Sequence, residues 1–183
     1  MRIGLVRHFP ATRGFPHKLK LLTLGEFFQW LDEYEISDIE YGQVNLGGIK
    51  FRKCFSSDLP RAVKTARLIY DGKIITMKAL REFHPQLFIK RNLKLPFFLW
   101  IILARLSWLI NHKTLLKSKQ DFQQRVRAAL DEILLTSDDD ILIVSHGVLM
   151  FVLRQELLRK GFTGPKFKIP SYGKLYLFQR VQG

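Results

Sequence analysis

The chain has 183 residues, of which 47% are hydrophobic and 25% charged, a length and composition that fit one globular domain and exclude a disordered or fibrous chain. Its 30 lysines and arginines outnumber 16 aspartates and glutamates, and the net charge of +14 favours anionic partners such as phosphate esters, nucleic acid or acidic membrane. Its single cysteine, Cys54, excludes an intrachain disulfide and a zinc cluster built from thiolates.

Apolar runs and amphipathic stretches alternate along the chain. In order, we predict strand 2–6, helix 24–34, strand 53–56, helix 59–70, strand 73–77, helix 95–110, helix 121–135, strand 141–145, helix 148–159 and strand 174–179. This alternation is typical of an α/β fold with a mostly parallel central sheet and helices on both faces. We expect a single domain over residues 1–183.

Two of these helices carry start signals. Thr23 is the expected N-cap of helix 24–34, because Glu26 follows it at the spacing of a capping box. Helix 59–70 should begin after Ser57 or Asp58 as its cap, with Pro60 in the first turn, where the missing N–H costs nothing. The first strand is too short for a signal peptide and ends in two polar residues, so we expect a cytoplasmic location.

Residues 85–118 form a basic, apolar insertion with no acidic residue. Within it, Leu95 to Ile110 is almost continuously apolar but shorter than the ~18–20 residues that span a bilayer. We interpret it as a lid-like helix that covers the edge of the sheet. A homodimer contact and a peripheral contact with anionic membrane are the alternatives.

Chemically competent side chains follow the predicted strands. Arg7 and His8 end the first strand, Arg61 begins the helix after the second, Glu82 follows the third, and His146-Gly147 follows the strand at 141–145. Because parallel strands end at one edge of the sheet, we expect these groups to meet there. Two arginines and two histidines around one point suit a phosphoryl group, whose oxygens accept charged hydrogen bonds.

The residue types suggest a division of labour. A neutral His8 imidazole is the expected nucleophile, forming a phosphohistidine that water hydrolyses. Arg7, Arg61 and His146, with the N–H groups at Gly147, would bind the phosphate. Glu82 would protonate the leaving group and activate water, with His84 as its rival. We expect neither a metal nor a cofactor.

The motifs that carry these residues resemble the histidine phosphatase superfamily, which includes the phosphoglycerate mutases. The matching stretches are Leu5-Val6-Arg7-His8, Ser56 to Ala66, Leu80-Arg81-Glu82 and Val144-Ser145-His146-Gly147. The resemblance implies a phosphoglycerate-mutase-like three-layer fold. It also implies phosphorylation of His8, phosphate binding by Arg7, Arg61 and His146, and acid/base chemistry by Glu82.

The chain departs from this family pattern near the first motif and in the insertion. Phe9 stands where a glycine usually follows the histidine, and Gly14 stands where the family often has a phosphate-binding asparagine. Thr12 and Arg13 are candidates to replace that asparagine. His84 and Arg105, in the region that builds the substrate lid in the family, are further candidates for substrate contacts.

We predict a metal-independent phosphatase that acts on a small phosphorylated substrate. A phosphomutase or a protein phosphohistidine phosphatase is the alternative within the same chemistry. A non-catalytic module that binds nucleic acid or anionic membrane is the alternative of another class, although the sequence carries no recognisable nucleic-acid motif.

Overall fold

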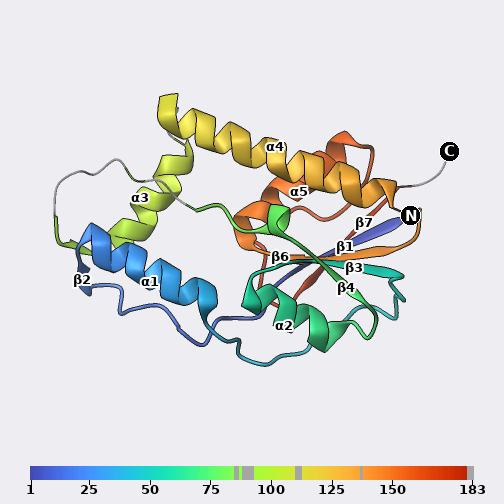
Figure 1. Cartoon of the computed structure of the whole chain (residues 1–183), viewed down its shortest axis with the longest axis horizontal. Coiled ribbons are helices and arrows are strands. Elements are labelled where there is room, and N and C mark those ends of the chain that lie inside the picture. Colours follow the sequence, from blue (N-terminus) through green and yellow to red (C-terminus); the bar gives the residue numbers. More distant parts are fainter. Residues whose placement is uncertain (85–86, 88–92, 110–112, 137, 181–183) are drawn as a thin grey trace.

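The computed structural model describes residues 1–84, 87, 93–109, 113–136 and 138–180 (Figure 1). In this part of the chain, five strands form a central sheet in the order β4-β3-β6-β1-β7. The strands are β1 (Arg2–Arg7), β3 (Lys53–Ser57), β4 (Ile74–Met77), β6 (Ile141–Ser145) and β7 (Leu175–Gln179). The first four are parallel to their neighbours, and β7 pairs antiparallel with β1, which confirms the expected mostly parallel sheet.

Helices cover both faces of the sheet. The helices are α1 (Leu24–Ile36), α2 (Pro60–Ile69), α3 (Phe97–Leu109), α4 (Lys113–Leu135) and α5 (Gly147–Arg159), with a 3-10 turn, η1, at Lys78–Leu80. Side chains alternate across β1, so Ile3 and Leu5 face α4 and α5, whereas Val6 packs in the cluster beneath α2. Because alternate side chains of the strand are apolar on both faces, each face of the sheet needs helices to cover it.

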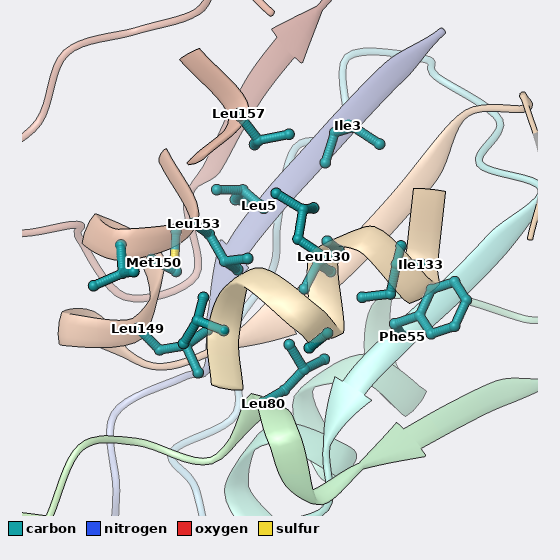
Figure 2. Packing of buried hydrophobic residues seen from close by; sticks show 14 of the residues in the cluster. Ile3, Leu5, Phe55, Leu80, Leu130, Ile133, Leu149, Met150, Leu153 and Leu157 are labelled. Carbon is teal, nitrogen blue, oxygen red and sulfur yellow. The ribbon is translucent and has the colours of Figure 1, made fainter. Parts of the chain in front are cut away.

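The larger core lies between the sheet and the α4–α5 pair. Figure 2 shows Leu130 of α4 and Leu153 of α5 beside Leu5 of β1, and Ile133 of α4 beside Phe55 of β3. The face predicted for helix 121–135 is buried as expected: Phe122, Val126, Ala129, Leu130 and Ile133. This core holds β1 and β6 side by side, which fixes the positions of the residues at their carboxyl ends.

A separate aromatic cluster joins α1 to α3 at the end of the molecule away from the N-terminus (Figure 1). Phe27 and Trp30 of α1 pack against Phe97 and Trp100, and the Trp100 indole N–H donates to the Leu22 carbonyl at 2.8 Å. The short strands β2 (Leu21–Leu22) and β5 (Leu95–Pro96) form an antiparallel ladder beside this cluster. The sequence analysis did not predict this ladder.

The start signals were right for α1, and for α2 they were right about Pro60 in the first turn but wrong about the cap. Thr23 and Glu26 form the expected capping box. The N-cap of α2 is Leu59, without a side-chain cap, and Pro60 is its first residue. Asp58 is unavailable as a cap because its carboxylate accepts two hydrogen bonds from Arg81, at 2.7 and 2.8 Å.

The larger boundary differences fall in and beside the insertion, and elsewhere the predicted ends differ from the observed ones by at most two residues. α4 begins at Lys113 rather than Asp121, and the apolar helix begins at Phe97, with Leu95 and Pro96 in β5. The described part of that helix ends at Leu109, so the predicted end at Ile110 lies outside the described residues. Among the helices described, none is long and apolar enough to cross a bilayer.

Candidate active site

The two site histidines lie side by side because β1 and β6 are adjacent and parallel. Arg7 pairs in register with Ser145, and the His8 backbone N–H donates to the Ser145 carbonyl at 3.0 Å. The next residue after each paired strand end is therefore a histidine. The imidazole centroids of His8 and His146 are 5.0 Å apart, close enough for both rings to contact one small ligand.

The hydrogen bonds of His8 define its tautomer. Its Nδ1 lies 2.6 Å from the Phe9 carbonyl oxygen, which can only accept, so Nδ1 carries the proton. Its Nε2 then accepts from the Arg61 Nε–H at 3.2 Å. Burial, followed by the Arg61 guanidinium, lowers the pKa of His8 to about 3. The imidazole is therefore neutral at physiological pH, with the Nε2 lone pair turned toward a permanent cation.

Phe9 occupies the position of the family glycine and still supplies this orienting carbonyl. Its buried ring lies between Gly42 and Gly173, where an added Cβ would come within 2.9 and 2.6 Å of the ring, respectively. Gly173 also has a positive φ of 59°, which favours glycine. Glycines elsewhere in the chain thus make the room that the larger side chain needs.

Arg61 is held in the second position of α2, almost fully buried. Its Nη1 donates to the Glu35 carbonyl at 2.9 Å, so the end of α1 orients the guanidinium. Thr65 ties the same helix to β1, because its hydroxyl accepts from the Phe9 N–H at 2.9 Å and donates to the Arg61 carbonyl at 2.8 Å. The nucleophile candidate and the arginine are therefore positioned by a shared network.

Arg7 and His146 carry polar atoms that the protein leaves without partners. Arg7 lies over the Tyr172 ring at 3.6 Å and donates from Nη1 to the Pro170 carbonyl at 2.9 Å. Among the described residues, the buried side-chain nitrogens or oxygens lacking a hydrogen bond are Arg7 Nε and both ring nitrogens of His146. Such groups cost about 1–3 kcal/mol each, so their clustering beside His8 indicates a site built for a polar ligand.

His146 is also neutral in this setting. Burial first, and then the positive charges of its neighbours, hold the pKa of His146 well below its ordinary value. A neutral imidazole offers one donor and one acceptor. His146 can therefore donate one hydrogen bond to a bound anion without adding a third charge to the two guanidinium groups.

Glu82 does not project freely from its strand end. Its Oε1 accepts from the N–H groups of Phe83 and Leu149 at 3.0 and 3.1 Å, and its Oε2 accepts from the Val148 N–H at 3.1 Å. Burial raises the pKa of Glu82, although these N–H donors act in the opposite direction. The carboxyl group thus caps α5, and a proton is held there more readily than on a solvated glutamate.

This arrangement corrects part of the sequence interpretation. We expected the N–H groups at the start of the last helix to be open to a phosphate, but Glu82 takes those of Val148 and Leu149. An ideal Cβ on Gly147 would lie 3.5 Å from the Arg7 guanidinium carbon. That is an ordinary van der Waals distance, so the approach of Arg7 does not require a glycine at this position.

A cavity of about 100 Å³ lies at the meeting point of these elements. Its lining residues are Arg7, His8, Leu31, Tyr34, Glu35, Arg61, Glu82, Phe83 and His84. A single water needs about 10–15 Å³ on this measure, so the cavity has room for a small polar ligand. His146 is fully buried behind it rather than in its lining.

His84, predicted as a rival acid or a substrate contact, lies at the edge of this cavity. Its ring stacks on Phe28 with centroids 5.8 Å apart, and its Nδ1 is 3.8 Å from Glu35 Oε1. The Glu35 carboxylate raises the pKa of His84, which favours the imidazolium form. The cavity lining therefore pairs an imidazole with the carboxylate that favours its protonated form.

The structure does not bring the other lid candidates to the cavity. Thr12 is exposed, and its backbone N–H donates to the Asp38 carbonyl. Arg13 forms a salt bridge with Glu33, with 2.6 Å between Nη2 and Oε2. Arg105 is exposed on α3. None of the three lines the cavity, and the replacement of the family asparagine by Thr12 or Arg13 stays a prediction.

Two tyrosines at the site were missed by sequence reasoning. Tyr172 lies over Arg7 with its ring centroid 5.5 Å from that of His8, and its hydroxyl is 3.1 Å from that of Tyr34. Tyr172 sits in a loop where periodicity is uninformative. The sequence feature that could have indicated Tyr172 is its position in the turn Ser171-Tyr172-Gly173, just before β7, which pairs antiparallel with β1.

Comparison with known proteins places this fold and site. Among solved structures, the chain is similar to an alpha-ribazole phosphatase from Shigella flexneri (TM-score 0.55, 19% identity, 97% of this chain and 89% of that chain). It is also similar to a phosphoglycerate mutase from Bacillus anthracis str. Sterne (TM-score 0.53, 17% identity, 98% and 92%). No curated protein matches the sequence. The fold is thus phosphoglycerate mutase-like.

The family follows from the sequence itself. Residues 41–180 match the family model of the histidine phosphatase superfamily (branch 1), so the chain belongs to that superfamily. Members of the superfamily are phosphatases or mutases. The matched region includes Arg61, Glu82 and His146 but begins after Arg7 and His8, whose place in the site rests on the geometry above.

Proposed function

We propose that this protein is a phosphatase that hydrolyses a phosphomonoester through a phosphohistidine on His8. The observation that carries the proposal is the set of unpartnered buried nitrogens of Arg7 and His146 beside a neutral imidazole. An anion with several acceptor oxygens would satisfy Arg7 Nε and the protonated ring nitrogen of His146, whereas an apolar ligand would satisfy neither.

The first half of the reaction is transfer of the phosphoryl group to His8. The Nε2 lone pair attacks phosphorus in line while the Arg61 Nε–H, which Nε2 accepts in the free protein, turns to a phosphoryl oxygen. Arg7 and Arg61 neutralise the charge on the transferring group. A protonated Glu82, favoured by the raised pKa of its carboxyl group, donates the proton to the departing alkoxide.

The second half returns the enzyme to its starting state. The ionised Glu82 removes a proton from water, the water oxygen attacks the phosphohistidine, and inorganic phosphate leaves with Nε2 again unprotonated. The Nδ1–H bond to the Phe9 carbonyl keeps the same tautomer throughout. Each proton that Glu82 gives up in the first half is recovered in the second.

We favour hydrolysis over mutase chemistry. A mutase must hold and reorient a doubly phosphorylated intermediate, and the phosphoglycerate mutases carry further substrate-clamping residues for this. The arginines provide the positive charge that a metal would otherwise supply, so we propose that turnover is metal-independent.

The test is a screen of phosphorylated metabolites in the presence of a chelator, with His8→Ala as the paired control. We expect phosphate release by the wild type and a loss on the order of a thousandfold in the variant. Retention of most activity by His8→Ala would overturn the proposal. Conversion of a doubly phosphorylated sugar acid to an isomer would indicate a mutase, and dephosphorylation of only a phosphorylated carrier protein would indicate a phosphohistidine phosphatase.

A further inference from the structure

Helix α3 is apolar on the side that faces solvent as well as on the side that packs. Phe97 and Trp100 are buried against α1. On the opposite side, Phe98, Ile102 and Leu106 recur every four residues with 38%, 44% and 41% of their surface exposed. A water-facing helix side is normally polar, so this apolar stripe (Phe98, Ile102 and Leu106) indicates a surface that functions in contact with something else.

The surroundings of the apolar stripe are basic. The segment of Lys18 to Leu22 runs along the start of α3, because the Phe98 and Phe97 N–H groups donate to the Lys18 and Lys20 carbonyls at 3.1 and 2.8 Å. This segment carries two exposed cations, Lys18 and Lys20. Two more are Lys94, just before β5, and Arg105 on α3. The same segment adds two further exposed leucines, Leu19 and Leu21.

Negative charge near the stripe is scarce and already engaged. The sequence from Phe83 to Gln120 contains no aspartate or glutamate. Two carboxylates act on these lysines: Glu26 lies near Lys20 and Lys94, and Glu33 lies near Lys20. Glu26 is also engaged in the cap of α1, where its Oε2 accepts from the Thr23 N–H and hydroxyl at 2.7 and 2.9 Å. The four exposed cations therefore outnumber the carboxylates that act on them.

We propose that the apolar stripe and the cations around it dock the protein on an anionic lipid bilayer surface, with the three side chains inserted among the headgroups. Apolar residues flanked by lysine and arginine, on a helix too short to span, are the features of interfacial binding. A second copy of the chain fits less well, because a symmetric contact through the stripe would bring the basic surroundings of two molecules, each of net charge +14, into one interface.

The test is co-sedimentation of the full chain with phosphatidylcholine vesicles, with and without phosphatidylglycerol. We expect binding to the anionic vesicles, and a loss of about tenfold or more in partitioning for the triple variant Phe98→Gln, Ile102→Gln and Leu106→Gln. This variant keeps the net charge, and glutamine is a good helix former, so far-ultraviolet circular dichroism should match the wild type.

A matched control replaces three apolar residues of similar exposure on other elements: Leu68→Gln, Ile75→Gln and Leu158→Gln. It should bind vesicles like the wild type. Equal binding by the wild type and the stripe variant would overturn the proposal, because net charge alone would then explain it. Absence of wild-type binding, or a dimer in size-exclusion chromatography that the stripe variant abolishes, would also overturn it. None of these readouts depends on phosphatase activity.

Discussion

Replacing His8 with asparagine should make the fold less sensitive to acid. In the folded protein the pKa of His8 is lowered from 6.5 to about 3 by burial and then by Arg61, so the ring stays neutral well below pH 6. In the unfolded chain the same ring protonates as the pH falls through about 6.5. Acid therefore favours the unfolded state at this residue. The stabilising difference is complete above pH ~6.5 and is lost progressively toward pH ~3.

The size of this effect follows from the two pKa values. Between pH 7 and pH 5, the unfolded chain gains about 0.7 proton at residue 8 while the folded chain gains almost none. Proton linkage then removes about 2 kcal/mol of unfolding free energy. Asparagine does not titrate, and its amide N–H can replace the Nδ1–H bond to the Phe9 carbonyl. Between pH 7 and pH 5 the unfolding free energy of the variant should therefore fall by about 2 kcal/mol less than that of the wild type.

Urea unfolding followed by circular dichroism at both pH values measures the difference. His17, exposed in a loop, provides the matched control, since His17→Asn removes a histidine that is not buried. That control should lose as much stability on acidification as the wild type. If His8→Asn also behaves like the wild type, the imidazole is not held neutral in the folded state, and the reasoning about the nucleophile is wrong.

Three further predictions concern the same cavity. Glu82→Gln should slow alkyl phosphates on the order of a hundredfold but nitrophenyl phosphate, whose leaving group needs little protonation, by much less; steady-state rates showing equal losses would remove its acid role. Arg61→Lys should reduce kcat/KM on the order of a hundredfold, because lysine lacks both the Nε–H facing His8 and the planar fork; a near-normal value would contradict the phosphate clamp. Glu35→Gln should lower the pKa of His84 in an NMR titration, because the Glu35 carboxylate raises it in the wild type, and an unchanged value would contradict the pairing.

Much of the architecture was predictable because it depends on local periodicity and on strand direction. The apolar run that contains Ile3, Leu5 and Val6 predicts a strand buried on both faces. Parallel strands end at the same edge of a sheet, so the residues that follow them meet there. The gathering of His8, Arg61 and Glu82 around one cavity then followed from where each strand stops. Roles assigned to these residues stay predictions until activity is measured.

The parts that were missed depend on long-range partners. The β2–β5 ladder has two residues on each strand, too few for any periodic signal. Asp58 is a good capping residue by type, but Arg81, which lies 23 positions away, takes its carboxylate. The polar first turns of α4, from Lys113, lack the apolar repeat on which the prediction of its start depended.

Site details were hidden for the same reason. No local pattern indicates that Glu82 would cap α5 through Val148 and Leu149, since that contact joins residues 66 and 67 positions apart. The stacking of Tyr172 on Arg7 likewise requires the loop before β7 to return to the end of β1. Chemistry-bearing residues could be chosen from the sequence, whereas their hydrogen-bond partners could not.

The central claim is that a phosphoryl group passes through the imidazole of residue 8. Rapid mixing with a substrate found in the metabolite screen, alkaline quenching to preserve phosphohistidine and peptide mass spectrometry test it directly. The account predicts an acid-labile phosphate on His8 that appears within one turnover and is absent in His8→Ala. Phosphate on another residue, or steady hydrolysis with no phosphorylated protein at any time, would contradict it.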